Sequence, residues 1–293
     1  MPARLPPALL KQVRTLALRG RRATDTLLGG EIRSVFRGTG MEFTDVRPYT
    51  EGDDLRHLDW NLFARTGHPY IKLYTEAREL TVLLVVDHSR STAVGNPEPK
   101  SARAIEVAAL LALVAAQQQD RVGLLGFSDR IGPVIPPGRG HRHVFGVVQA
   151  LFAFEATGNG TDLAGALRAA GALLKRRALI VVLSDFLAPD WATPLKGLAA
   201  RHEVTAIALE DARDTALPTG GWVTLAGAER SGSVLFDSGD PLARRRAEAA
   251  AKRTRFNRAA AFAAAGVREV VIRTEGDYMS ALRAAFGRSG GRR

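Results

Sequence analysis

Cysteine is missing from the 293-residue sequence, which excludes disulfide bonds, thiolate metal ligands and a cysteine nucleophile. Long apolar runs are missing as well, since the longest spans 107–116, well short of the roughly 18 residues that a membrane-spanning helix needs. Lys11 and Arg14 interrupt the start of the chain, so we expect no signal peptide. Nucleotide-binding glycine motifs do not occur either. The sequence therefore predicts a soluble cytoplasmic protein with no transmembrane segment.

Acidic residues are fewer than basic ones: 30 Asp and Glu stand against 41 Lys and Arg, for a net charge of +11. The excess lies at the two ends, because residues 1–40 carry a net +6 and residues 241–293 a net +9. The middle of the chain has a net charge of −4. We expect the basic ends to be solvated helix faces and a frayed tail, with contact to an acidic partner as the alternative.

From residue 80 onward, short apolar runs alternate with longer segments rich in alanine and leucine, which is typical of a parallel sheet covered by helices. The predicted strands are 80–86, 121–127, 178–184, 203–209 and 267–273, with an antiparallel edge strand at 130–135. The predicted helices are 101–118, 141–154, 162–174, 191–201, 241–265 and 277–286. Most strands are apolar throughout, so both of their faces should be buried. This predicts an α/β fold with a doubly wound, mostly parallel sheet and helices on both faces.

Two segments, both rich in turn-forming residues, do not fit this alternation. The predicted organisation is a basic helix at 1–30, an irregular or small β segment at 31–79, the α/β domain at 80–287 and a basic tail at 288–293. The second irregular segment is an insertion in the α/β domain at about 211–240.

Oxygen-bearing side chains follow the predicted strands, at the edge of a doubly wound sheet where ligands bind. Asp87, Ser89 and Ser91 follow the first strand, and their spacing places them on one side of a locally extended chain. Thr161 precedes a predicted helix, and Asp185 follows the 178–184 strand. Carboxylates and hydroxyls together suit a hard divalent cation. These five residues therefore predict a site for Mg²⁺, or for Mn²⁺.

The order D-x-S-x-S, then Thr, then Asp resembles the metal-ion-dependent adhesion site of von Willebrand factor A domains, and the likeness covers residues 80 to about 287. The stretch from Met41 to Arg65, with its MEFTDVRPY and EGDD motifs, resembles the signature of the bacterial "domain of unknown function 58" family. The first resemblance implies a metal that binds a carboxylate of a partner protein. The second implies an adaptor or chaperone-like partner of a MoxR-type AAA+ ATPase, without enzymatic activity.

The adhesion-site motif departs from its usual pattern at Arg90, where a small residue is common, and at Thr92, where Met is common. A guanidinium that turned inward would repel a divalent cation and could bind an anion instead. We expect Arg90 to point outward, because two facing carboxylates without a cation would be unstable.

Residues 42–60 hold six carboxylates interleaved with Arg47, Arg56 and His57. They indicate an ion-pair network with Tyr49 and Trp60 as apolar anchors, rather than an acid and base pair.

Two alternative functions stay open. One is a metal-dependent phosphoester hydrolase, for which His88 and Asp162 are the candidate bases. The other is a nucleic-acid or membrane-surface binder that acts through the basic ends, although few aromatic residues are available there to stack on bases. We expect no nucleic-acid partner.

Overall fold

A computed structural model describes residues 41–76, 80–93, 95, 97–156, 158–214, 221–226 and 233–286. Its centre is a six-stranded sheet with the order β10-β7-β6-β3-β4-β5. All neighbouring strands are parallel except β5, which pairs antiparallel with β4 at the edge. The strands of this sheet are β3 (Thr81–Asp87), β4 (Arg121–Phe127), β5 (Ile131–Gly138), β6 (Leu179–Ser184), β7 (Glu203–Glu210) and β10 (Arg268–Arg273).

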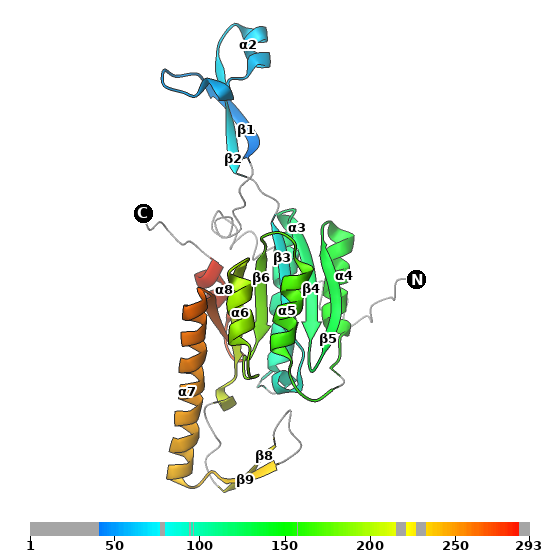
Figure 1. The fold of residues 1–293 in the computed structure, drawn as a ribbon, viewed down its shortest axis with the longest axis vertical. Coiled ribbons are helices and arrows are strands. Elements are labelled where there is room, and N and C mark those ends of the chain that lie inside the picture. Colours follow the sequence, from blue (N-terminus) through cyan, green and yellow to red (C-terminus); the bar gives the residue numbers. More distant parts are fainter. Residues whose placement is uncertain are drawn as a thin grey trace.

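Helices cover both faces of the sheet (Figure 1), as the strand composition predicts. Along β3, Val82, Leu84 and Val86 pack on one side, while Leu83 and Val85 pack on the other. The first layer consists of α3 (Lys100–Gln117), α4 (His141–Ala153) and α8 (Tyr278–Phe286), and the second of α5 (Leu163–Leu173), α6 (Ala192–Ala199) and α7 (Pro241–Ala265). Burial on two faces explains why these strands read as apolar throughout rather than alternating.

The predicted strands and helices of the sheet domain are confirmed to within a few residues at each end. In chain order the strands follow the doubly wound arrangement 3-2-1-4-5-6, with the antiparallel strand at the predicted edge. The order reverses between β3 and β6, which pair directly. This reversal creates a topological switch point, where ligands of such sheets bind.

Two small antiparallel hairpins lie at opposite ends of the sheet (Figure 1). The first joins β1 (Met41–Pro48) and β2 (Tyr70–Glu76), and between its strands the chain forms a 3₁₀ turn, η2 (Leu55–His57), and a helix, α2 (Trp60–Thr66). The second joins β8 (Trp222–Ala226) and β9 (Ser233–Asp237) within the predicted insertion. In Figure 1 the first hairpin lies beyond the amino ends of the parallel strands and the second beyond their carboxyl ends.

The remaining predictions concern the basic ends of the chain, the 42–60 segment and membrane spans. The predicted helix at 1–30 and the tail at 288–293 lie outside the described residues. Trp60 is not an anchor of its segment, since it is 64% exposed. The solvated helix expected in the basic C-terminal part is wrong for Arg258 of α7, which is buried and ion-paired. Within the described part of the chain, the helices lack the combination of length and apolarity that crossing a membrane requires.

Candidate metal centre at the carboxyl edge of the sheet

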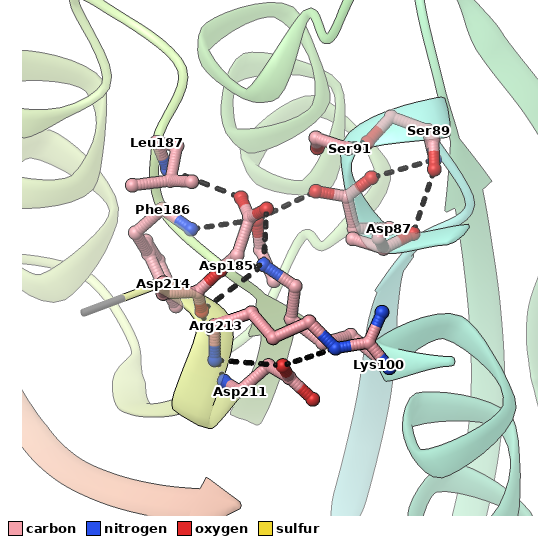
Figure 2. A network of polar contacts seen from close by, with 12 residues as sticks. Asp87, Ser89, Ser91, Lys100, Asp185, Phe186, Leu187, Asp211, Arg213 and Asp214 are labelled. Carbon is pink, nitrogen blue, oxygen red and sulfur yellow. Dashed lines mark hydrogen bonds and ion pairs between the residues drawn. The ribbon is translucent and has the colours of Figure 1, made fainter. Parts of the chain in front are cut away.

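Two buried carboxylates lie at the switch point (Figure 2). Asp87 is the last residue of β3, and Asp185 directly follows β6. Because β3 and β6 are paired and parallel, their carboxyl ends bring the two side chains to the same edge. Asp87 is fully buried and Asp185 is 3% exposed. The sheet topology therefore brings together the two aspartates that the sequence predicts as metal ligands.

Both oxygens of Asp87 accept short hydrogen bonds. The Ser89 amide donates to Oδ1 at 2.8 Å, and the Ser184 hydroxyl donates to Oδ2 at 2.6 Å. Burial nevertheless raises the pKa of Asp87 to about 7, and the negative charge of Asp185 adds to the rise. Burial and the nearby charge of Asp185 therefore outweigh the stabilisation that these hydrogen bonds give to the Asp87 carboxylate.

Ser89 and Ser91 supply two hydroxyls beside Asp87, with their oxygens 2.9 Å apart. The chain here is not extended as expected, because it turns into a 3₁₀ helix, η3 (Arg90–Ala93). The buried Thr92 hydroxyl holds this turn by donating to the Ser89 carbonyl at 2.7 Å. The turn still brings the two serines together, although by a geometry other than the predicted one.

Arg90 is exposed, and its guanidinium donates to the Asn159 side chain on the neighbouring loop. The prediction that it points outward is confirmed.

A strained backbone position fixes Asp185. Phe186, the next residue, has a φ of 54°, which is unusual for any residue other than glycine. Its ring is buried against Trp191 and Phe262, with centroids 5.4 and 5.0 Å away. The amide of Leu187 then donates to Asp185 Oδ1 at 3.1 Å. The aromatic packing stabilises the strained turn, which in turn orients the carboxylate.

Lys100, which the sequence analysis did not single out, lies in this site (Figure 2). Its Nζ is 3.3 Å from Asp185 Oδ2 and 3.1 Å from Oδ1 of Asp214. Asp214 ends a short 3₁₀ turn, η4 (Ala212–Asp214), at the root of the predicted insertion. Burial disfavours the ammonium, but the charges of Asp185 and Asp214 outweigh that effect and raise the pKa of Lys100.

Thr161 lies on the loop before α5, on the wall of a cavity of about 480 Å³. The same cavity is lined by Asp129, Asn159, Asp162 and Asp190, a set that does not include Asp87 or Asp185. The Arg90 to Asn159 hydrogen bond links this loop to the one that carries Ser89 and Ser91. The membership of Thr161 in the metal site stays a prediction.

The donor set fits a hard divalent cation. Asp87, Asp185, Ser89 and Ser91 all offer oxygen, and Mg²⁺ is commonly held by one or two carboxylates with waters completing its shell. No group of three or more His, Asp or Glu residues that could hold a metal ion is present in the described parts of the chain. A metal would therefore depend on these two carboxylates, on the serines and on ligands from outside the protein.

The two candidate bases of the hydrolase alternative have structural roles. The His88 ring packs edge-on against Phe154, with centroids 4.8 Å apart, and burial lowers its pKa to about 4. Asp162 caps α5 by accepting a hydrogen bond from the Gly165 amide. Neither arrangement favours a role in proton transfer.

The carboxylates of the 42–60 segment likewise support local structure. Arg47 forms a two-pronged ion pair with Asp53, at 2.7 and 2.6 Å. Asp54 and Asp59 accept backbone hydrogen bonds at the starts of η2 and α2. The ion-pair interpretation is confirmed for Arg47 and Asp53, whereas Asp54 and Asp59 act as helix caps.

The strand order and the two aspartates at the switch point define a von Willebrand factor A-like α/β protein. Residues 45–257 match the family described as "Protein of unknown function DUF58", and the chain belongs to that family.

Relatives include the uncharacterized protein Mb1516 of Mycobacterium bovis and the uncharacterized protein Rv1480 of Mycobacterium tuberculosis. Each is 35% identical over 278 residues, which cover 94% of this chain and 87% of the relative. Among solved structures, BatB from Bacteroides thetaiotaomicron is 13% identical, with a TM-score of 0.44 over 70% of this chain and 95% of BatB. The SpRpn10 VWA domain is 12% identical, with a TM-score of 0.42 over 73% of this chain and all of that domain.

Proposed function

We propose that this protein is a non-catalytic interaction module that binds a carboxylate side chain of a partner protein through Mg²⁺ or Mn²⁺. The observation that carries the proposal is the pair of buried aspartates, Asp87 and Asp185, at the switch point. The Ser89 and Ser91 hydroxyls beside them complete an oxygen-lined rim. Burial and, to a lesser extent, the charge of Asp185 raise the pKa of Asp87 to about 7, and a bound cation would offset both effects.

This chain's own residues would position the ion. Ser184 and the Ser89 amide orient Asp87, and the turn at Phe186 orients Asp185. When bound, the ion would supply open coordination positions for an oxygen of a partner's Asp or Glu. In the fold family that this chain resembles, such a partner completes the metal shell, and the family resemblance favours a MoxR-type AAA+ ATPase as that partner.

The first test is the stabilisation of the protein by Mg²⁺. We expect the melting temperature to rise with Mg²⁺ in the wild type, because a ligand that binds only the folded state stabilises it by about 2.7 kcal/mol at 100 times its Kd. Asp87→Ala should abolish the rise. Asp45→Asn, on the exposed part of β1, is the control and should respond like the wild type. Equal shifts in Asp87→Ala and in the wild type would refute the metal assignment.

The second test concerns the partner. The purified chain should retain a MoxR-type ATPase from the same organism in Mg²⁺ and release it in a chelator, and Asp87→Ala should not retain it. Retention that survives both the chelator and the substitution would mean that the ATPase binds elsewhere. No retention in any condition would remove the ATPase from the proposal, while the metal test above would stand unaffected.

A further inference from the structure

We propose that Lys100 is a built-in cation of this site, which competes with a divalent ion for Asp185. The inference rests on the proposed function, because it concerns the regulation of the same site. On this proposal, the affinity of the site for metal depends on the ion pairs of Lys100 with Asp185 and Asp214. Because Asp214 lies in the insertion that begins after β7, a change in the insertion would change that affinity.

The contacts of Lys100 hold its ammonium between two carboxylates. Nζ lies 3.3 Å from Asp185 Oδ2, and 3.1 and 3.3 Å from the two oxygens of Asp214. Lys100 is also only 1% exposed, which leaves it little access to water. The lysine is therefore a fixed charge within the site rather than a surface side chain that happens to lie nearby.

Two physical effects oppose a lysine at this position. Burial removes the ammonium from water, which is strongly unfavourable unless carboxylates pair with it. Lys100 is also the first residue of α3, where the positive end of the helix dipole disfavours a cation. Among the described residues, the carboxylates of Asp185 and Asp214 offset these effects. The ammonium thus occupies part of the negative field that a divalent ion would otherwise use.

Competition follows from the contacts of Asp185. Its Oδ1 accepts the Leu187 amide and its Oδ2 faces Lys100, so an ion that binds Asp185 must lie close to the ammonium. Positive charges a few ångströms apart repel strongly in a buried site. When the ion binds, Lys100 must therefore shift its pairing toward Asp214. Asp214 belongs to η4, so metal binding would change the ion pair that holds the root of the insertion.

Opposite effects of two substitutions test the proposal, with the Mg²⁺ Kd measured by isothermal titration calorimetry. Lys100→Met should bind Mg²⁺ about tenfold more tightly than the wild type or better, because the competing charge is gone. Asp214→Asn should bind several-fold more weakly, because it removes a negative charge and leaves the ammonium to Asp185 alone. A purely structural role for the ion pair would not move the two affinities in opposite directions.

A control variant and a double variant complete the experiment. Arg258→Met removes a buried cation from an ion-pair network outside the site, and it should leave the Mg²⁺ Kd unchanged. Loss of Lys100 leaves two carboxylates without their cation, which can prevent folding. The double variant Lys100→Met, Asp214→Asn removes one charge of each sign. It should bind Mg²⁺ more tightly than Asp214→Asn. The single variant Asp214→Asn should fold, because it removes only the charge of a partly exposed side chain.

The outcomes separate this inference from the proposed function. Wild-type binding with tighter binding by Lys100→Met supports both. Wild-type binding with equal or weaker binding by Lys100→Met overturns the inference and leaves the metal site standing. Binding by Lys100→Met but not by the wild type supports the inference and contradicts Mg²⁺ as the ligand of the native site. If neither lysine variant folds, unchanged or tighter binding by Asp214→Asn overturns the inference, and weaker binding supports it.

Discussion

Two buried ion-pair networks occupy different parts of the sheet, and they differ in charge balance. In the first, Lys100 lies between Asp185 and Asp214, and Asp87 adds a third carboxylate nearby. In the second, Arg258 of α7 lies between Glu210 at the end of β7 and Glu269 of β10. Arg255 also pairs with Glu210, at 2.8 Å. Among the described residues, the second network thus has two cations for two carboxylates. In the first, Lys100 alone serves Asp185 and Asp214, Asp87 adds a third carboxyl group, and the adjoining Arg213 pairs with Asp211.

The ion-pair distances also differ between the two networks. Arg258 makes contacts of 2.6 and 2.8 Å, while the contacts of Lys100 range from 3.1 to 3.3 Å. A guanidinium has a planar fork that can serve two carboxylates at once, whereas an ammonium acts as a point charge. The balanced network holds α7 against β7 and β10, and its carboxylates are already paired with cations of the protein. The unbalanced one lies at the switch point and retains negative charge that an external cation could neutralise.

The largest expected effect is on the balanced network. Arg258→Met should lower the free energy of unfolding by about 3–5 kcal/mol, because it leaves Glu269 unpaired and Glu210 with Arg255 alone. Chemical denaturation, with and without Mg²⁺, measures the change, and Mg²⁺ should not reduce it. Arg245→Met, at an exposed position of the same helix, is the control and should have little effect. A loss that Mg²⁺ repairs would contradict the separation of the two networks.

A smaller effect concerns acid sensitivity near the unbalanced network. Burial lowers the pKa of His88 from 6.5 to about 4, so the folded state resists its protonation. His88 therefore contributes stability above pH 6.5 that is lost as the pH falls toward 4, by up to about 3 kcal/mol. His88→Phe keeps an aromatic ring against Phe154 and should remove this contribution when unfolding is followed across that range. It leaves the opposite contribution of Asp87, whose raised pKa makes the folded state gain stability as the pH falls below about 7, so this variant should be more acid-resistant than the wild type. His68→Phe, on the exposed hairpin, should follow the wild type.

The smallest effect is expected in the first hairpin, whose ion pair is partly open to solvent. The side chains of Arg47 and Asp53 are 41% and 17% exposed, and exposed pairs contribute little to stability. Arg47→Ala should leave both the thermal midpoint of the protein and its response to Mg²⁺ unchanged, as followed by calorimetry. A clear drop in either quantity would show that the hairpin supports the sheet or the site.

The fold was largely predictable from the sequence, because burial of a strand on two faces leaves a continuous apolar run. The runs that form β3 and β6 carry this pattern. Their chain order, together with the acidic residues after them, predicted that Asp87 and Asp185 lie at one edge of the sheet. Asp87 and Asp185 could be predicted as partners because parallel strands end at one edge. Ser89 and Ser91 were found by spacing, although a 3₁₀ turn, not an extended chain, brings their hydroxyls together.

Lys100 and Asp214 escaped prediction because neither follows a strand motif. Lys100 opens a helix and Asp214 lies in a turn, positions where charged residues are ordinarily exposed. One local signal was available, since a cation at the first position of a helix is unfavourable and requires an explanation. That signal does not reveal the partner, which lies 85 residues away in the case of Asp185 and 114 in the case of Asp214.

The sequence by itself determined the strands, the helices and the identity of the two switch-point aspartates, because periodicity and strand order are local properties of the chain. Only the tertiary structure decided the charge balance at that point. The balance depends on which distant cation is buried between which carboxylates, and packing of α3 and η4 against the sheet edge sets that choice. The same physics distinguishes Arg258, which shares two carboxylates with Arg255, from Lys100, which alone serves Asp185 and Asp214 beside Asp87.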